Sequence, residues 1–373
     1  MADTGDVSGT HPPSPETPQV PQLRPRELFW RDIQPWLQEQ GYMLRPRYRP
    51  RWKPSFTLDD DVYDFEDGAP IINDAVLDAT RMSTNELVML KRVSQKVHPH
   101  EVELTRYFSE EPLRSDPRNH CVHLLDVLDV PDHPDFKIMV FPLLRTYNNP
   151  KFETIGEALE FFRQVFEGLN FMHQCHVAHR DCGRLNIMMD PQPMFPKMYH
   201  PRYTNYSRDF KGAAKYHSRT ARPVRYYLID LGLSRRYDPE NTSPREPPIL
   251  GGDKSVPEFK DGTEPLDPFP TDVYYVGNVI RLDFMTVYVG LEFMNPLVDD
   301  MVQTDPLKRP TMDAVVSHFS EIYHNLPPST LWSRLVAKRE TTNRFIVFQR
   351  NVGHTIRTLI HILLRRKPMP TAS

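Results

Sequence analysis

The sequence predicts an α+β fold with two lobes, a small lobe rich in β-strands followed by a larger helical lobe. Short β-like apolar runs dominate residues 70–140, whereas apolar residues recur at spacings of three and four from residue 154 onward. Such a succession of strands and then helices along one chain is typical of α+β proteins. With 373 residues, the chain can form two or three compact units or one large two-lobed domain.

Composition excludes several other classes of protein. The apolar share of 39% and the charged share of 25% are ordinary for a soluble globular protein, and a net charge of -3 gives no general attraction to nucleic acid or anionic membranes. The three cysteines have neither metal-site nor disulfide-scaffold spacing, which favours a reducing compartment. The first residues lack the apolar run of a signal peptide, and no stretch approaches the roughly 20 apolar residues of a membrane helix. We therefore expect an intracellular protein, cytoplasmic or nuclear.

The N-terminal part divides into two segments. Residues 1–24 are rich in Pro, Ser and Thr and are expected to be disordered. Residues 25–61 contain one amphipathic helix, "RELFWRDIQPWLQEQ", and then a basic arm, "RPRYRPRWK". The arm is compatible with nucleic-acid binding. The acidic stretch "DDDVYDFED" just downstream favours an extended arm folded over the domain, with its charge balanced locally.

The elements of the two lobes follow in order. Strands are expected in "AVLDATRM", "LVMLKRV", "HLLDVLDV" and "FKIMVFPLL", with one helix, "PHEVELTRYFS", among them. A long helix is expected over residues 154–174. Its apolar face consists of Ile155, Leu159, Phe162, Phe166, Leu169 and Met172.

Four polar residues after strands or on loops point to phosphoryl transfer. Lys91 ends the "LVMLK" strand, Asp181 and Asn186 lie five residues apart after the long helix, and Asp230 follows the buried strand "RYYLI". A lysine can hold phosphates, and aspartate and asparagine oxygens suit Mg²⁺. A second aspartate can accept the proton of an acceptor hydroxyl.

These residues belong to a series of motifs that resembles the eukaryotic protein kinases over roughly residues 62–324. The motifs are "VMLK", "HRDCGRLN", "DLG", "VPE", the "DVYYVG" helix with Asp272 and Gly277, and "DPLKRPTM", whose Arg309 would pair with Glu258. Six motifs in family order are specific, although each alone is weak. A fainter resemblance is to kinase-like proteins of basidiomycete fungi.

The resemblance implies an N-lobe over about residues 62–141, a C-lobe over about 145–324, and a protein substrate phosphorylated with ATP and Mg²⁺. Asp181 would be the catalytic base, Arg180 a clamp for the activation segment, and Asp272 a brace beneath the catalytic loop. Glu101 would pair with Lys91, because apolar residues then lie one, three and seven positions after this glutamate. Glu103 is the alternative. The implied catalytic set is Asp181, Lys91, Asn186, Arg180 and Arg184. The implied nucleotide-binding set is Lys91, Glu101, Met89, Phe141, Pro142, Leu143, Leu144, Met188 and Asp230, with Asn186 and Asp230 as metal ligands.

Four departures from the family pattern bear on activity. No Gly-x-Gly-x-x-Gly precedes Lys91, which predicts an altered or missing lid over the phosphates. Met89 replaces a small alanine that packs on adenine, and Gly183 occupies the position of the catalytic-loop lysine, for which Arg184 is a candidate replacement. Leu231 in "DLG" replaces the phenylalanine of the family motif, a mild exchange of one apolar residue for another.

The activation segment, residues 230–258, leaves the acceptor and the regulation open. Its hydroxyls, among them Thr242 and Ser243, either are ordinary loop residues or include one whose phosphorylation orders the segment through Arg180. "GGDK" before "VPE" lacks the threonine of Ser/Thr kinases, although we expect Ser/Thr rather than Tyr as acceptor.

Two basic segments extend the family pattern. Residues 191–225 form an insertion with eight Lys or Arg against Asp209 alone, either a solvated loop or a site for an acidic partner. The tail, residues 325–373, is expected to form a basic amphipathic helix with Val352, Ile356, Leu359, Ile360, Leu363 and Leu364 on its apolar face. Packing against the domain is expected, with a membrane surface or a partner as alternatives.

Three functions are compatible with these patterns. The first is a protein kinase, favoured by the complete set of lysine, acids and amide. The second is a pseudokinase that acts as a scaffold, favoured by the missing glycine loop, Met89 and Gly183. The third is a small-molecule phosphotransferase of the aminoglycoside-kinase type, which shares the spacing of Asp181 and Asn186 but lacks the "VPE" and "DPLKRP" motifs.

Overall fold

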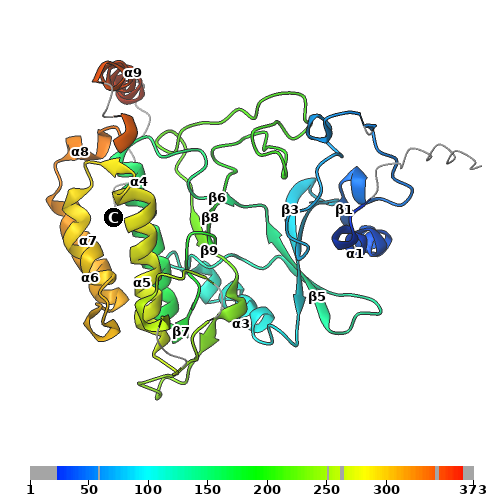
Figure 1. Cartoon of the computed structure of the whole chain (residues 1–373), viewed down its shortest axis with the longest axis horizontal. Helices are drawn as coiled ribbons and strands as arrows, with labels where there is room; N and C mark the ends of the chain where they lie inside the picture. Colours follow the sequence, from blue (N-terminus) through cyan, green and yellow to red (C-terminus); the bar gives the residue numbers. More distant parts are fainter. Residues whose placement is uncertain (1–22, 58, 250–251, 261–263, 341–343, 364–373) are drawn as a thin grey trace, which may run out of the picture. The chain divides into compact units, whose positions relative to one another are not determined.

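The structure is a computed structural model that describes residues 23–57, 59–249, 252–260, 264–340 and 344–363, within two compact units, residues 1–86 and 87–373 (Figure 1). Strands dominate the first part of the chain and helices the second, so the α+β class is confirmed. All four expected strand segments and both expected helices of residues 70–174 are present. No described helix is long and apolar enough to cross a membrane.

The first unit combines two short helices with a strand pair. Helices α1 (Leu28–Asp32) and α2 (Gln34–Glu39) replace the single helix expected there. Pro35 explains the break, because proline cannot donate the hydrogen bond that would continue α1. Strand β1 (Tyr42–Leu44) pairs antiparallel with β2 (Val76–Arg81), with Met43 opposite Thr80.

The basic arm is folded onto its own unit. Arg47 is buried and forms a two-pronged ion pair with Glu27, from Nε to Oε1 at 2.8 Å and from Nη2 to Oε2 at 2.9 Å. Arg45 pairs with Asp78 at 2.9 Å. Bidentate arginine–carboxylate pairs of this kind fix the path of a chain. Arg45 and Arg47 are therefore neutralised within the unit, as expected, but by Asp78 and Glu27 and not by the acidic stretch, whereas Arg49 and Arg51 are exposed.

The second unit begins with three antiparallel strands and a helix. Strand β3 (Glu86–Ser94) pairs with β5 (Phe136–Pro142), and β5 with β4 (Asp126–Asp129). Lys91 lies opposite Met139 in this ladder. Helix α3 (Glu101–Ser109) follows β3.

Helix α4 (Ile155–Gln174) forms the centre of the helical part, next to α7 (Figure 1). Its predicted apolar residues are all buried, and Phe166 meets Phe319 of α7 edge to face with ring centroids 5.3 Å apart.

Short strands carry the loops of the site and pair as β6–β8–β9 and β7–β10. Their bounds are β6 Arg145–Thr146, β7 Val177–Ala178, β8 Ile187–Met189, β9 Tyr226–Leu228 and β10 Arg235–Arg236. The later elements are α5 Pro268–Ile280, β11 Tyr288–Val289, α6 Asn295–Met301, α7 Met312–Asn325, α8 Pro328–Trp332, β12 Val336–Ala337 and α9 Arg344–Leu363.

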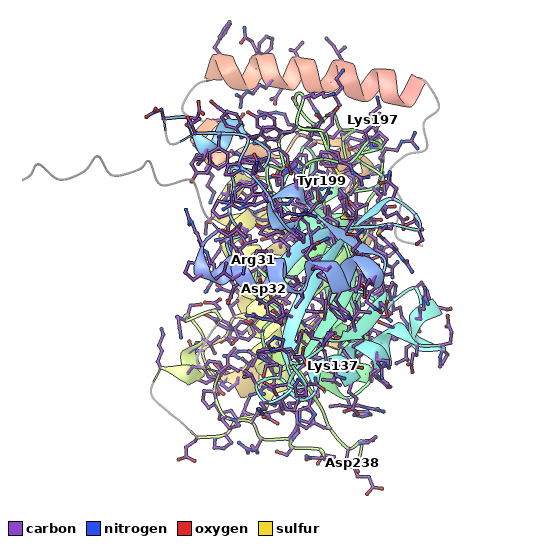
Figure 2. All side chains as sticks on the ribbon, turned by 90° about the vertical axis from the view of Figure 1, so that its right-hand side faces the viewer. Arg31, Asp32, Lys137, Lys197, Tyr199 and Asp238 are labelled. Atoms are coloured by element: carbon purple, nitrogen blue, oxygen red, sulfur yellow. The ribbon has the colours of Figure 1, made fainter. Side chains whose placement is uncertain are left out.

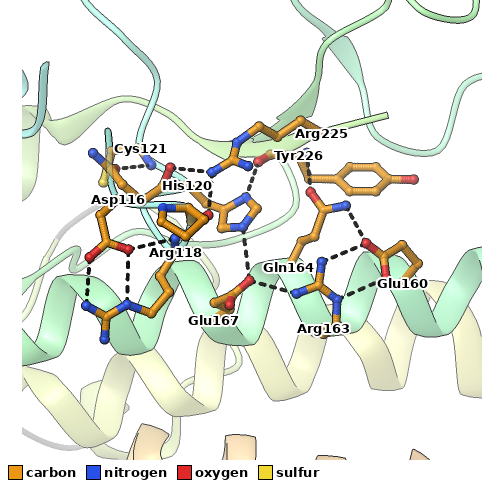
Figure 3. Close-up of polar contacts among 12 residues, drawn as sticks. Asp116, Arg118, His120, Cys121, Glu160, Arg163, Gln164, Glu167, Arg225 and Tyr226 are labelled. Atoms are coloured by element: carbon orange, nitrogen blue, oxygen red, sulfur yellow. Dashed lines mark hydrogen bonds and ion pairs between the residues drawn. The ribbon is translucent and has the colours of Figure 1, made fainter. Parts of the chain in front are cut away.

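A polar network anchors β9, the strand that leads to Asp230, on α4 (Figure 3). The Gln164 side chain accepts a hydrogen bond from the Tyr226 N–H at 2.8 Å, and His120 contacts the Tyr226 carbonyl at 2.8 Å. His120 also contacts Glu167, which pairs with Arg163 one turn earlier. The network pairs the backbone N–H and carbonyl of Tyr226, the first residue of β9, and so holds the start of this strand on α4.

The tail is helical, as expected, but its apolar face is not fully packed. Helix α9 is tied down by polar contacts, from Arg334 to Asn351 and from His354 to the Trp332 carbonyl, both at 2.8 Å. Val352 and Ile356 are 41% and 53% exposed, so the expected packing of these two residues on the domain is wrong. The polar contacts hold α9 with Val352 and Ile356 facing outward. Leu359, Ile360 and Leu363 lie in α9, but their side chains are not described, and Leu364 and the N-terminal segment up to residue 22 lie outside the described residues.

Candidate active site

The loop between β7 and β8 is braced by a buried carboxylate. Asp272 of α5 is fully buried and accepts hydrogen bonds from the backbone N–H groups of His179 and Arg180, both at 2.7 Å. Arg180 has a left-handed backbone with φ of 68°, an unfavourable conformation for a non-glycine residue. The carboxylate thus holds a strained turn immediately before Asp181, as the sequence predicts for Asp272.

Asp181 and Asn186 form one hydrogen-bonded pair. The Asn186 amide Nδ2 donates to the carbonyl and to carboxylate Oδ2 of Asp181, both at 2.8 Å. Because the nitrogen is committed, the amide oxygen Oδ1 of Asn186 is left to act as an acceptor. Burial raises the pKa of Asp181, an effect that the nearby charge of Asp230 reinforces.

Lys91 joins α3 to the "DLG" loop. Its amine donates to Oε1 of Glu101 and, at 2.8 Å, to Oδ1 of Asp230. Glu101 is 1% exposed, whereas Glu103 lies on the exposed face of the helix, so Glu101 is the residue that pairs with Lys91. Burial opposes ionisation, but the two carboxylates raise the pKa of Lys91, and Lys91 in turn lowers the pKa of Asp230 against the effect of burial. These shifts favour the charged forms of Lys91 and Asp230, whereas burial raises the pKa of Glu101 despite the charge of Lys91.

The surroundings of Asp230 leave little room for a side chain at Gly232. Asp230 is left-handed with φ of 63°, and its side chain accepts the N–H of Gly232 at 3.3 Å. A Cβ on residue 232 would lie 3.0 Å from Nδ1 of His98 and 3.1 Å from Oε2 of Glu101. The Ile229 N–H donates to the Asn186 carbonyl at 2.9 Å, which ties this turn to the Asp181–Asn186 pair.

The expected nucleotide-binding residues of the strands lie together. Met89 of β3 is opposite Phe141 of β5, and Pro142 is opposite Val88. Leu143 and Leu144 follow as a buried segment, with the Leu144 carbonyl accepting the Tyr199 hydroxyl at 3.4 Å. Met188 lies in β8 opposite Thr146.

A cavity of about 750 Å³ opens beside Asp181 and Asn186. Gly252 of the activation segment reaches this cavity with φ of 71°, and a Cβ there would lie 2.6 Å from Oδ1 of Asp181. Arg184 also lines it, but its guanidinium pairs with Asp283 at 3.3 Å rather than with Asp181. In the sequence, "GGDK" was notable only because it lacks the threonine found in Ser/Thr kinases. Nothing in the sequence identified Asp283.

Two arginines fix the activation segment. Arg309 forms a bidentate ion pair with Glu258, with Nη–Oε distances of 2.7 and 2.6 Å, which is the pair that the sequence predicts. Arg180 pairs with Glu246 at 3.2 Å and donates to the carbonyls of Leu233 and Pro247. Glu246 was not predicted, because only the folded segment brings it to Arg180.

Comparison with known proteins agrees with this arrangement. A stretch of 125 residues is 29% identical to mitogen-activated protein kinase 10 of Arabidopsis thaliana, and covers 31% of this chain and 32% of that protein. A stretch of 69 residues is 33% identical to the serine/threonine-protein kinase CAK1 of Saccharomyces cerevisiae, and covers 18% of each. These similarities support membership of the protein kinase superfamily. The similarity is distant, since no protein-family model matches the chain and the alignments span a third or less of each relative.

The similarity to kinases implies ATP and Mg²⁺ as ligands, and the residues present fit both. The Asp230 carboxylate and the free amide oxygen of Asn186 are hard oxygen ligands of the kind that Mg²⁺ prefers. The Lys91 amine, kept charged by Glu101, suits a phosphate oxygen.

Proposed function

We propose that the chain is an active protein kinase that transfers the γ-phosphoryl group of MgATP to a protein hydroxyl. The observation that supports this most is the joining of two intact clusters, Lys91–Glu101–Asp230 and Asp181–Asn186, through the hydrogen bond from Ile229 to Asn186. Phosphoryl transfer depends mainly on positioning and on charge stabilisation, and these clusters supply both. Serine or threonine is the proposed acceptor, in keeping with the name of the yeast relative.

In this proposal each residue has one task. Asp181 accepts the hydrogen bond of the substrate hydroxyl and then its proton, while the amide of Asn186 holds the carboxylate in position. Lys91 holds phosphate oxygens, and Asn186 and Asp230 hold the metal. Mg²⁺ supplies neutralisation of the charge on the phosphates when it is bound. The cavity beside Asp181 would receive the acceptor side chain.

The decisive variant is Asp181→Asn, with Asp299→Asn on the exposed side of α6 as the matched control. Removing a general base costs about 10² to 10⁴ in rate. We expect phosphorylation of a generic protein substrate to fall by that factor in Asp181→Asn, with an unchanged thermal midpoint, and to persist in the control. Undiminished phosphorylation by Asp181→Asn would show that the assignment is wrong.

A second candidate function, a binding scaffold with weak or no turnover, is favoured by the segment between β1 and β2. This segment contains no glycine-rich loop, and its one glycine, Gly68, approaches the Val62 carbonyl so closely that a Cβ would clash. Gly68 therefore serves the packing of its own unit. Thermal unfolding with MgATP separates the candidates, since nucleotide at about 100 times its Kd stabilises a protein by about 2.7 kcal/mol. No shift at millimolar MgATP would favour the scaffold.

A further inference from the structure

Part of the basic insertion is packed by aromatic side chains, although several of its lysines are exposed. Phe195 and Tyr199 are buried and contact each other with ring centroids 5.0 Å apart; Figure 2 labels Tyr199 and the neighbouring, exposed Lys197. Between the insertion and residues 145–153 lies a cavity of about 500 Å³. Residues that line it include Arg145, Asn149, Lys151, Phe195, Thr204 and Tyr216.

Arg145 is a buried cation whose hydrogen-bond partners among the described residues are all neutral. Its side chain donates to the carbonyls of Asn149 and Thr204 and to the Asn149 amide oxygen, at 2.8–3.0 Å. The Tyr199 hydroxyl is a further hydrogen-bond partner of the guanidinium, and it too is neutral. The rings of Phe195 and Tyr199 hold the guanidinium, 4.6 and 4.3 Å from their centroids. No described carboxylate lies within ion-pair distance, so burial lowers the pKa of Arg145.

Two further cations belong to the same region. Arg219, 5% exposed, donates to the carbonyls of Tyr147 and Lys151, and its Nε is buried without a hydrogen-bond partner in the described chain. Lys151 is exposed at the cavity and has no ion pair with any described residue. Glu153 is the one acid among the lining residues. Burying a cation against neutral groups, without a carboxylate partner, is costly, and an oxyanion would offset that cost.

The cavity adjoins the catalytic cleft through a single short strand. Arg145 and Thr146 are consecutive in β6, and successive side chains of a strand point to opposite sides. Arg145 lines the cavity of the insertion, whereas Thr146 lines the cavity that contains Asp181. A group bound at Arg145 is therefore separated from the substrate cleft by the thickness of one strand.

We propose that this cavity binds a phosphoryl group carried by a side chain of a protein partner, with Arg145 as the buried anchor and Lys151 at the rim. The planar fork of an arginine suits phosphate oxygens, and the volume accommodates a phosphorylated side chain. Its position beside the cleft makes it a docking site for substrates that are already phosphorylated, a consequence that rests on the proposed kinase function. The binding itself does not depend on catalysis.

The test is isothermal titration of the full chain with O-phosphoserine amide, inorganic phosphate and acetate. Lys151→Met is the main variant because its side chain is exposed, and Lys211→Met, an exposed lysine of the same insertion that does not line the cavity, is the matched control. Arg145→Lys keeps the charge but removes the fork, and its thermal midpoint reports on folding. Lys91→Met excludes anion binding at the catalytic cluster.

We expect O-phosphoserine amide to bind more tightly than acetate, and Lys151→Met to weaken its binding about tenfold, the effect of one charge-assisted hydrogen bond. A folded Arg145→Lys variant should weaken binding at least as much, whereas Lys211→Met and Lys91→Met should bind as the parent does. Any of three results would overturn the proposal. These are equal binding of O-phosphoserine amide by the parent and Lys151→Met, loss of that binding in Lys91→Met, and no binding of O-phosphoserine amide at millimolar concentration. Binding of inorganic phosphate but not of O-phosphoserine amide would overturn the assignment to a phosphorylated side chain.

Discussion

The ion pair between Arg180 and Glu246 predicts an activation segment that does not need phosphorylation. Arg180 immediately precedes Asp181, the proposed base, and its side chain is 8% exposed, whereas that of Glu246 is 20% exposed. Glu246 thus supplies the negative charge that a phosphorylated loop residue would otherwise supply. The backbone of Glu246 is also paired in both directions with Leu266, at 2.9 Å, which holds the carboxylate in place.

The change to make is Glu246→Gln, which keeps the shape of the side chain and removes its charge. Removing one partner of a fully buried pair costs about 3–5 kcal/mol. Glu246 is partly exposed, and Arg180 keeps its bonds to Leu233 and Pro247, so we expect about 1.5 kcal/mol. If the ordered segment is required for transfer, kcat/KM should fall about tenfold.

Two measurements check this expectation. Steady-state phosphorylation gives kcat/KM, and amide hydrogen exchange of the segment around Glu246 reports its local opening. Glu240→Gln is the control, because Glu240 is exposed in the same segment and makes no side-chain contact in the described structure. Phosphatase treatment, or replacement of the exposed Thr242 and Ser243 by alanine, should leave activity unchanged. The reasoning would be refuted if Glu246→Gln had the amide hydrogen exchange and the activity of the parent. It would also be refuted if replacing Thr242 and Ser243 by alanine abolished activity.

Three further predictions concern single positions of the same unit. Gly232→Ala places a Cβ 3.1 Å from Oε2 of Glu101, so kcat should fall about tenfold while the thermal midpoint changes little, and equal kcat would contradict the crowding. Asp272→Asn removes the charge that accepts two backbone N–H groups in a fully buried site, and urea titration should show a loss of about 3 kcal/mol. Burial raises the pKa of Glu258, but Arg309 outweighs it and leaves that pKa lowered. This pair therefore stabilises the fold above about pH 4.3 and loses its effect as pH falls through the lowered pKa; Glu258→Gln should flatten that part of the stability profile, and an unchanged slope would exclude the pair as its cause.

The parts of the fold that depend on local patterns could be predicted from the sequence. The apolar spacing of three and four identified α4 because that helix buries one stripe against its neighbours, and the four β-like runs matched strands β2 to β5. The pairings of Lys91 with Glu101 and of Arg309 with Glu258 were expected because motif order fixes these partners.

The parts that depend on long-range contacts could not be predicted. Nothing local indicates that Glu246 reaches Arg180, or that Arg184 turns to Asp283, since both contacts need the completed fold. The insertion was expected to be a solvated loop or an exposed basic site, yet its basic Arg219 is buried. Its aromatic residues were the available signal, because rings adjacent to arginines provide cation–π partners that allow a cation to be buried.

The two clusters and the missing glycine loop together predict where the kinetics of this protein depart from those of ordinary kinases. The residues proposed to act on the reacting groups are present and paired, so the chemical step should be close to normal once ATP is bound. The loop that would cover the phosphates is absent, and Met89 occupies space beside the expected adenine site, which weakens binding of ATP in ground state and transition state alike. A loss of uniform binding raises KM and leaves kcat unchanged. We therefore expect a KM for ATP near or above the millimolar end of the usual range, with kcat in the ordinary range of about 1–100 per second.

Met89→Ala should lower the KM for ATP without changing kcat, whereas Met82→Ala, at an exposed position outside the expected nucleotide site, should change neither. Tight binding of ATP combined with a very low kcat would contradict this argument, because the defect would then lie in the chemical step, at Gly183 or Arg184, and not in how the nucleotide is held.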